Sequence, residues 1–329
     1  ALTCGCDGRP STTARTVEAP PVRPPQTANE VATYLRRLGC SVAAIDVAGQ
    51  LCYQVTLRGP GVQAKDAAYL AGLGNIAELE IRAKSLSFAS LDHLGAKDEL
   101  RALECYGTQF TDEGAQRLKD FSHIRRLRLA GTRLTEKSLQ YVAHLTELES
   151  LDLKGSPVGP DGTAHLSGLR QLRELHMNHE SLTDDSVRHL ASLTELRTLT
   201  LVSRRIGNRG VQGLTGLTKL ESLNLSITAI SNEGLKSLAE LTQLRTLDLS
   251  VTQVDDAGLP YLGAFGQLQD LSLVGNSITD VGMVHLAMLP GLVSLRLDGT
   301  QVTDSGLSHL ALLTQLADLS LIRTEITDA

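Results

Sequence analysis

The sequence predicts an α/β solenoid, a curved stack of short parallel strands and helices. Three observations predict it. A leucine-rich pattern returns every 24 residues without an insertion, and each unit passes from a strand-like to a helix-like leucine spacing. Aromatic residues make up only 3% of the chain, with no Trp, so leucine must supply most of the buried surface. Such a composition suits many small, identical packing units better than one irregular core.

The repeat register runs from Cys52 to the end of the chain. It comprises eleven complete 24-residue repeats and a twelfth that stops after fourteen residues. Self-similarity at a fixed period of this length is typical of a solenoid. The last unit lacks its helical leucines, which indicates either a shortened chain or an edge covered by a partner. The first residues of the repeats are Cys52, Ile76, Leu100, Ile124, Leu148, Leu172, Leu196, Leu220, Leu244, Leu268, Leu292 and Leu316.

The consensus LxxLxLxxTxITDxGLxxLxxLxx explains the local structure of one repeat. The LxLxx segment alternates with a period of two, which predicts a short strand with its leucines turned inward. Thr at position 12 followed by Asp predicts a helix start, because the hydroxyl can cap free N–H groups and the carboxylate suits the positive helix end. Leucines at positions 16, 19 and 22 then line one face of a short helix. One unit cannot bury that face alone, but a stack buries it continuously.

This pattern resembles the leucine-rich-repeat family across residues 52–329. Its ITDxGL segment is most similar to short bacterial-type repeats and to the repeats of F-box leucine-rich-repeat proteins. The resemblance implies a curved parallel β-sheet on the concave face and short helices on the convex face. It brings no catalytic residues with it, because the family is defined by its packing positions. We therefore expect no enzyme activity and no cofactor.

Residues 27–51 are expected to form an N-terminal cap made of a helix and a strand. Thr27–Glu30 fits a capping box, and an apolar helical stripe runs from Val31 to Leu38. Residues 41–47 are expected to be a strand that turns towards the first repeat. A cap of this kind shields the open first edge of the repeat core.

Residues 1–26 are expected to be a disordered, proline-rich tether, because five prolines among polar residues cannot build a core. The segment Leu-Thr-Cys-Gly-Cys at its start resembles the end of a bacterial lipoprotein signal, with Cys6 as the acylated residue. A lipid-anchored or secreted protein of the cell envelope is therefore expected. The alternative is a disordered tail with two free thiols, in which case a cytoplasmic location is open.

Charge and cysteine usage exclude several classes of protein. The net charge of −6 argues against a general nucleic-acid binder, and no run of 18 apolar residues predicts a transmembrane segment. Five scattered cysteines form neither a disulfide framework nor a zinc motif. Cys52 and Cys105 occupy positions that are normally leucine, so they are expected to be buried core thiols.

Binding is expected at the outward strand positions 3 and 5, which line the concave face. Charges of both signs alternate there, which favours a protein or peptide partner over a polyanion. Arginine and tyrosine, which are enriched at binding hot spots, cluster near the ends of neighbouring strands. The candidate binding residues are Arg101, Tyr106, Arg126, Arg128, Asp152, His176 and Arg204.

An alternative explanation applies to the arginines of this set. Glu78, Glu80, Glu104 and Asp152 lie within one or two repeats of them. Because neighbouring repeats stack closely, the arginines are equally suited to mutual ion pairing with these carboxylates.

The segment His176–Glu180, HMNHE, has the residue types of a metal site. Its three-residue histidine spacing brings side chains together on a helix, but not on a strand that leaves its sheet. We therefore expect no metal site, and the chain contains no G-x-S-x-G, phosphate-loop or H-E-x-x-H motif. His176 itself is expected to face the concave surface.

Position 9 is Thr or a close substitute in most repeats, and this column is expected to tie adjacent turns together. Two consecutive repeats carry Glu180 and Arg204 there instead. Equivalent residues of stacked repeats lie about 4.8 Å apart, so we expect a Glu180–Arg204 ion pair in place of the Thr column.

The resemblance implies a non-catalytic scaffold that binds a protein or peptide on its concave face, displayed at a membrane surface if the lipid anchor is present. The alternative is a substrate-recruiting adaptor of a ubiquitin-ligase-like complex. That alternative rests only on the similarity to the repeats of F-box proteins.

Overall fold

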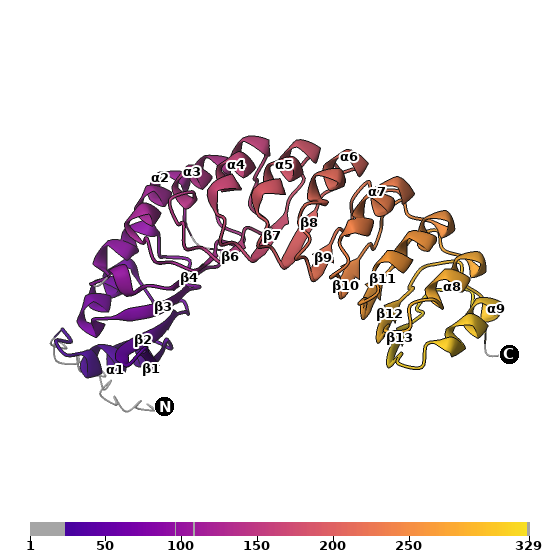
Figure 1. Ribbon diagram of the computed structural model, residues 1–329. Helices are drawn as coiled ribbons and strands as arrows, with labels where there is room; N and C mark the ends of the chain where they lie inside the picture. The colour runs from indigo at the N-terminus through magenta and orange to yellow at the C-terminus, as the bar shows by residue number, and fades with distance from the viewer. Residues whose placement is uncertain (1–23, 96, 108, 328–329) are drawn as a thin grey trace, which may run out of the picture.

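The computed structural model describes residues 24–95, 97–107 and 109–327. Within these residues the chain forms one open sheet of 13 strands, whose order in space is their order in the sequence. The strands line the inner side of an arc and the helices its outer side (Figure 1). Every strand pair from the second strand onward is parallel. The predicted α/β solenoid, with a concave sheet and convex helices, is confirmed.

The strands are short, as the LxLxx segment predicts, and only the first three exceed five residues. Their bounds are β1 Ser41–Val47, β2 Gln50–Leu57, β3 Ile76–Ile81, β4 Ala102–Cys105, β5 Arg126–Arg128, β6 Ser150–Asp152, β7 Glu174–Asn178, β8 Thr198–Val202, β9 Ser222–Asn224, β10 Thr246–Asp248, β11 Asp270–Ser272, β12 Ser294–Arg296 and β13 Asp318–Ser320.

Most convex segments contain one or two α-helical turns and continue as a 3₁₀ turn. In the described residues the α-helices are α1 Ala28–Arg37, α2 Asp112–Ala115, α3 Leu139–Val142, α4 Pro160–Ala164, α5 Asp184–Arg188, α6 Asn208–Val211, α7 Asn232–Ser237, α8 Asp280–Leu286 and α9 Asp304–Leu307. Three segments, Ala64–Leu73, Phe88–His93 and Asp256–Ala264, are 3₁₀ throughout. Pro260 lies inside the last of these, where its missing N–H disfavours α-helical bonding. Across residues 24–95, 97–107 and 109–327, no helix is long and apolar enough to cross a membrane.

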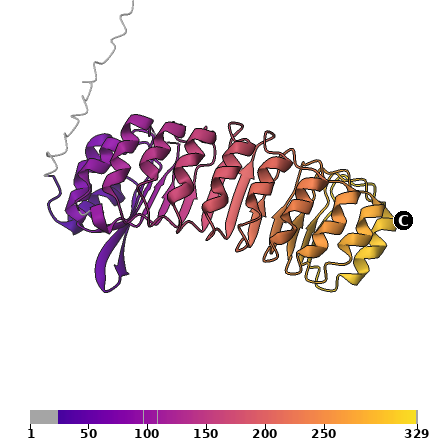
Figure 2. The same cartoon turned by 45° about the horizontal axis from the view of Figure 1, so that its top comes forward.

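The first repeat is preceded by a helix and a hairpin. Thr27 and Glu30 form a reciprocal capping box at the start of α1, as predicted. Strand β1 pairs antiparallel with β2, and the two turn at Ala48 and Gly49, which both adopt left-handed backbone angles. The hairpin projects from the N-terminal end of the solenoid (Figure 2). Cys6 and the rest of residues 1–23 lie outside the described residues.

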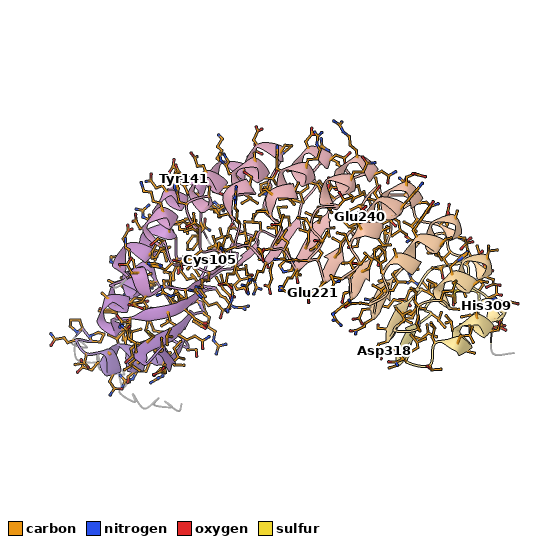
Figure 3. All side chains as sticks on the ribbon, in the orientation of Figure 1. Cys105, Tyr141, Glu221, Glu240, His309 and Asp318 are labelled. Atoms are coloured by element: carbon orange, nitrogen blue, oxygen red, sulfur yellow. The ribbon has the colours of Figure 1, made fainter. Side chains whose placement is uncertain are left out.

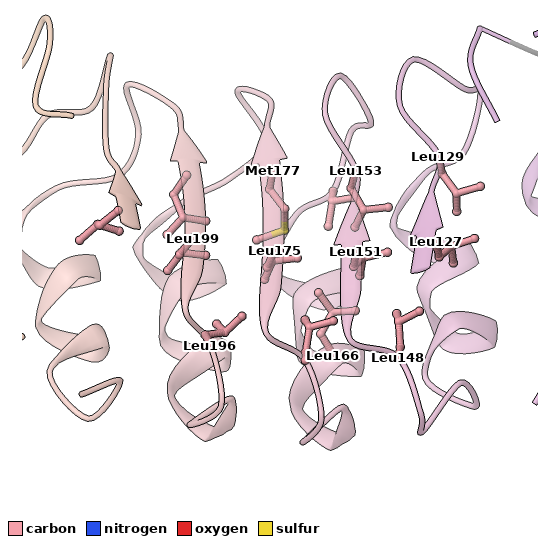
Figure 4. Packing of buried hydrophobic residues seen from close by; sticks show 14 of the residues in the cluster. Leu127, Leu129, Leu148, Leu151, Leu153, Leu166, Leu175, Met177, Leu196 and Leu199 are labelled. Atoms are coloured by element: carbon pink, nitrogen blue, oxygen red, sulfur yellow. The ribbon is translucent and has the colours of Figure 1, made fainter. Parts of the chain in front are cut away.

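The core is a continuous layer of leucine between the sheet and the helices. Leucines at matching positions of neighbouring repeats lie side by side, with Met177 in a leucine position (Figure 4). Full burial of each side chain contributes about 1.5–3 kcal/mol. Cys52 and Cys105 are fully buried in this layer, as predicted, and burial raises the pKa of the Cys105 thiol.

Adjacent repeats are tied together at the helix starts, by Asp at position 13 and Thr at position 12 of the next repeat. The backbone N–H of Thr303 donates to Oδ1 of Asp280 over 2.8 Å, and its hydroxyl donates to Oδ2 over 2.6 Å. The same hydroxyl accepts the N–H of Ser305, which is the predicted helix cap. The bonds from Thr303 lower the pKa of Asp280. Equivalent clamps are Asp112–Thr135, Asp256–Thr279 and Asp304–Thr327.

Glycine at position 15 makes room for this clamp. A Cβ atom on Gly282 would overlap Oδ1 of Asp256 and lie 2.6 Å from Cδ1 of Leu259. Asp256 cannot swing aside without losing both of its hydrogen bonds from Thr279. The Gly of the TDxG pattern is therefore required by the carboxylate of the preceding repeat.

The expectation for position 9 is wrong for most repeats. The hydroxyl of Thr132 donates to the carbonyl of Leu129, three residues earlier in its own repeat, over 2.9 Å. This bond closes a turn in which position 8 takes a left-handed backbone. Among the described position-9 residues, Ser156 and Asn276 do bond a carbonyl of the preceding repeat. The other threonines that follow the pattern of Thr132 are Thr228, Thr252, Thr300 and Thr324.

The predicted Glu180–Arg204 ion pair is also wrong, because no contact within 4.0 Å joins these two described, exposed side chains. An ion pair between two solvated side chains gains at most about 1 kcal/mol, too little to order them. Strands β7 and β8 are five residues long here, and the left-handed turn is absent from both repeats. Ser203 in the altered turn bonds the preceding repeat, by donating its hydroxyl to the carbonyl of Leu182 over 2.9 Å.

The clamp is tested by Gly282→Ala. We expect the free energy of unfolding to fall by about 1–3 kcal/mol, the usual cost of overpacking, because the new methyl displaces Asp256. Gly263→Ala is the control, since a Cβ atom there would meet no atom within 4 Å. Urea unfolding followed by circular dichroism measures both. Equal stability of the two variants would contradict the clamp.

Candidate functional site: the concave face

Arg128 is the centre of a hydrogen-bonded network on strands β4 to β6. Its Nε atom lies 3.0 Å from Oδ2 of Asp152, and its Nη1 atom lies 3.3 Å from Oε2 of Glu104. Nη1 also donates to the hydroxyl of Tyr106 over 2.6 Å, and that hydroxyl donates to Glu104 over 2.8 Å. These four residues, called here the β4–β6 network, hold one another in place, with one guanidinium shared between two carboxylates. Mutual ion pairing, the alternative for the arginines, is therefore present at Arg128.

Two guanidinium groups lie close to the ring of Tyr106. The guanidinium carbon of Arg82 lies 4.4 Å from the ring centroid, and that of Arg128 lies 5.8 Å from it. Arg82 is in turn paired with Glu80. The sequence reasoning missed Arg82, because it lies at position 7, just past the strand positions that were considered.

Arg126 and Arg101 are held more loosely. Nη1 of Arg126 lies 4.0 Å from Glu78 and 3.7 Å from Glu104, and 49% of the side chain is exposed. Arg101 contacts Glu99 at 3.9 Å and donates to the carbonyl of Asp98. Both arginines remain accessible to a partner.

A polar groove of about 590 Å³ runs along the N-terminal ends of the strands. Positions 2 and 3 contribute equally to its lining. At position 2 each backbone N–H donates to the position-2 carbonyl of the preceding repeat, for example Arg197 to Arg173 over 2.8 Å. Glu221 lies on this inner side of the arc, whereas Tyr141 lies among the helices (Figure 3). The groove is lined by Glu78, Arg101, Ala102, Arg125, Arg126, Glu149, Ser150, Arg173, Glu174, Arg197, Thr198 and Glu221.

The sequence reasoning did not identify the position-2 column as a surface. The sequence feature that indicates this surface is the arginine or glutamate that stands directly before each of several successive strands. Arg197 pairs with Glu221, and Arg125 lies 3.6 Å from Glu149. Arg173 is exposed and has no ion-pair partner within 4.0 Å among the described residues.

His176 lies on β7 in register with Asp152, so it adjoins the β4–β6 network. Its Nδ1 atom lies 2.9 Å from Oγ1 of Thr200. His179 instead faces its own turn, with Nδ1 2.8 Å from the hydroxyl of Ser181. The two imidazoles therefore serve separate contacts, and the described residues contain no group of three side chains placed to hold a metal ion.

The structure brings together most of the sequence-predicted residues. Tyr106, Arg126, Arg128, Asp152 and His176 occupy neighbouring positions on β5 to β7 and beside β4. Arg101 belongs to the adjoining groove. Arg204 stands apart, because it follows the end of β8 and is exposed.

His176 provides a test of this placement. Burial lowers its pKa, and the positive charge of Lys154 lowers it further. We expect an NMR titration to place the pKa of His176 below the ordinary value of about 6.5, and Lys154→Gln to move it upward. Arg205→Gln, which removes a more distant cation, should leave it unchanged. A pKa at or above the ordinary value in the unmodified protein would refute the buried placement.

Comparison with known proteins agrees with this architecture. A family model described as a leucine-rich repeat region matches residues 81–328. No curated protein matches the chain. The solved structures that are similar include an internalin (inlF) from Listeria monocytogenes, with a TM-score of 0.62 and 21% identity over 92% of this chain and 89% of that chain. An internalin C2 (inlC2) from the same organism has a TM-score of 0.49 and 25% identity over 78% of this chain and 91% of that chain. The repeat register, the parallel sheet and the family match together show that the chain belongs to the leucine-rich-repeat family.

Proposed function

We propose that this protein is a non-catalytic scaffold that binds a protein or peptide partner on its concave face. The observation that carries the proposal is the polar groove, which crosses successive strands and offers both arginine and glutamate side chains. A surface of this kind suits an extended partner that contacts several repeats at once. Charges of both signs favour selective recognition of a protein over binding to a uniform polyanion.

The surroundings of His176 support a binding role. A hydroxyl beside an imidazole is one half of a nucleophile–base arrangement, and Thr200 and His176 supply it. In catalytic sites a third group orients the base. No described carboxylate hydrogen-bonds the other ring nitrogen of His176. Nothing among the described residues favours the alternative of a ubiquitin-ligase adaptor.

The proposal is tested by charge reversal in the groove. Random peptides of about 12 residues, which span about 40 Å when extended, are selected on the unmodified protein by phage display. We expect Arg126→Glu combined with Arg173→Glu to weaken the best peptide at least tenfold, measured by calorimetry. These two arginines are exposed, and neither is tied into the β4–β6 network by a short bond.

Lys119→Glu combined with Arg209→Glu is the matched control. It changes the net charge equally, but on the convex side, where both side chains are exposed. Selected peptides that bind the groove variant as tightly as the unmodified protein would contradict binding on this part of the concave face.

We propose further that the solenoid is displayed at the cell envelope through a lipid on Cys6. The resemblance of Leu2–Cys6 to a lipoprotein signal supports this. A chain secreted by a bacterial host is expected to partition into detergent, since an acyl chain supplies about 0.8 kcal/mol of membrane affinity per CH₂. Cys6→Ser should move it to the aqueous phase, and Cys4→Ser should not. Aqueous partition of the unmodified chain would refute the anchor.

A further inference from the structure

Two β-branched residues occupy a backbone conformation that disfavours them. Position 8 is left-handed in most repeats, and several of these repeats place glycine there. Ile227 and Val251 stand at the same position with φ of 56°. Left-handed backbone crowds a Cβ atom, and a branched one most of all. Strain of this kind persists where the side chain has a purpose other than folding. The glycines at this position are Gly59, Gly107, Gly131, Gly155, Gly275 and Gly299.

Burial does not explain these two side chains. Ile227 is 40% exposed and Val251 is 49% exposed. They lie in consecutive repeats, and the N–H of Ile227 donates to the carbonyl of Ser250 over 2.8 Å. The N–H of Val251 likewise donates to the carbonyl of Val274 over 2.7 Å. The half-buried Val202 and Val274 also lie where a strand ends, and these four residues at the C-terminal ends of β8 to β11 are called here the apolar rim.

Two carboxylates without cations lie on the strands beside the apolar rim, Asp248 at the rim end of β10 and Asp270 at the opposite end of β11. No described Lys, Arg or His lies within 4.0 Å of either carboxylate. Asp248 is held in place by Asn224, whose amide donates to it over 2.9 Å, and by the N–H of Ser250 at 2.9 Å. Asp248 is therefore held in place and partly desolvated, but no described cation forms an ion pair with it.

The charge of the concave face changes along the arc. Around β4 to β6 the carboxylates are matched by arginines, as in the β4–β6 network. On positions 3, 5 and 7 of the last five repeats, Arg296 is the single cation among the described residues. The carboxylates on those positions are Asp248, Asp270, Asp298 and Asp318.

We propose that the apolar rim, with Asp248 and Asp270, is the docking site for an extended partner segment that alternates apolar residues with lysine or arginine. In an extended segment successive side chains point to opposite sides, so apolar residues can cover Ile227 and Val251 while cations reach the carboxylates. Covering the rim removes exposed apolar surface, and the cations relieve repulsion between neighbouring carboxylates. The proposal rests on the concave face being a protein-binding surface, and it adds the place and the chemistry.

Defined peptides test this chemistry. The probe is a peptide of alternating leucine and lysine, with two matched peptides in which glutamate replaces lysine or serine replaces leucine. Fluorescence anisotropy is expected to show binding of the leucine–lysine peptide at least tenfold tighter than either matched peptide. Its affinity should fall as salt is added, because salt screens exposed charges. Equal binding of the three peptides would overturn the proposal.

Protein variants locate the site. Ile227→Asn combined with Val251→Asn should weaken the leucine–lysine peptide at least tenfold, and Asp248→Asn combined with Asp270→Asn should do the same. Asn tolerates left-handed backbone, so the rim variant is expected to melt at or above the unmodified protein. Val281→Ser combined with Met288→Ser removes exposed apolar surface from the convex helix α8 and the turn after it, and should leave binding unchanged.

The outcomes separate this inference from the proposed function. Equal peptide binding by the rim, carboxylate and convex variants would overturn the docking site. If the groove variant Arg126→Glu with Arg173→Glu still loses its selected peptide, the proposed function survives that result. If the groove variant also binds as the unmodified protein does, both proposals fail.

Discussion

A single 24-residue repeat cannot bury its own leucines, and the rest of the structure depends on that constraint. Each repeat has a leucine-lined strand on one side and a leucine-lined helical turn on the other, and only the neighbouring repeats complete the cover. Stacking therefore fixes the register at every strand, and with it the position of every polar side chain on the concave face. The Asp–Thr clamp then reinforces this register at the helix starts, where the leucines do not reach.

Because leucine stacking and the Asp–Thr clamp fix the repeats, polar residues of one type on the concave face can have different roles. Arg128 is bonded to Asp152, Glu104 and Tyr106, so several of its N–H donors are already used within the protein. Arg173 has the same side chain on the same sheet but no described ion-pair partner, which leaves it free to meet a ligand. The β4–β6 network is largely buried, with 19% of the Glu104 side chain and 9% of the Asp152 side chain exposed, so it holds these groups in a fixed arrangement on the concave surface.

The repeats that depart from the consensus are the most informative. In β7 and β8 the loss of Thr at position 9 goes with longer strands and a different turn. At Ile227 and Val251 the turn is kept, but side chains that it disfavours are held in it. The change at β7 and β8 alters the backbone at the ends of these strands, whereas Ile227 and Val251 place apolar side chains where other repeats have glycine. The first departure lies in the repeats that supply Arg173 and Arg197 to the groove, and the second lies in the two repeats that follow.

The sequence by itself determined the solenoid, the 24-residue register and the burial of Cys52 and Cys105, because periodic burial is written directly in the spacing of leucines. It also determined which residues lie near one another, so the cluster around Tyr106 and Arg128 was predictable. Hydrogen-bond directions were not, and only the tertiary structure decided them. Thr132 bonds its own repeat and Asp280 bonds the next one, since these choices depend on backbone angles and on atoms 23 residues away. The Gly of TDxG shows the same limit, because its cause is a carboxylate in another repeat.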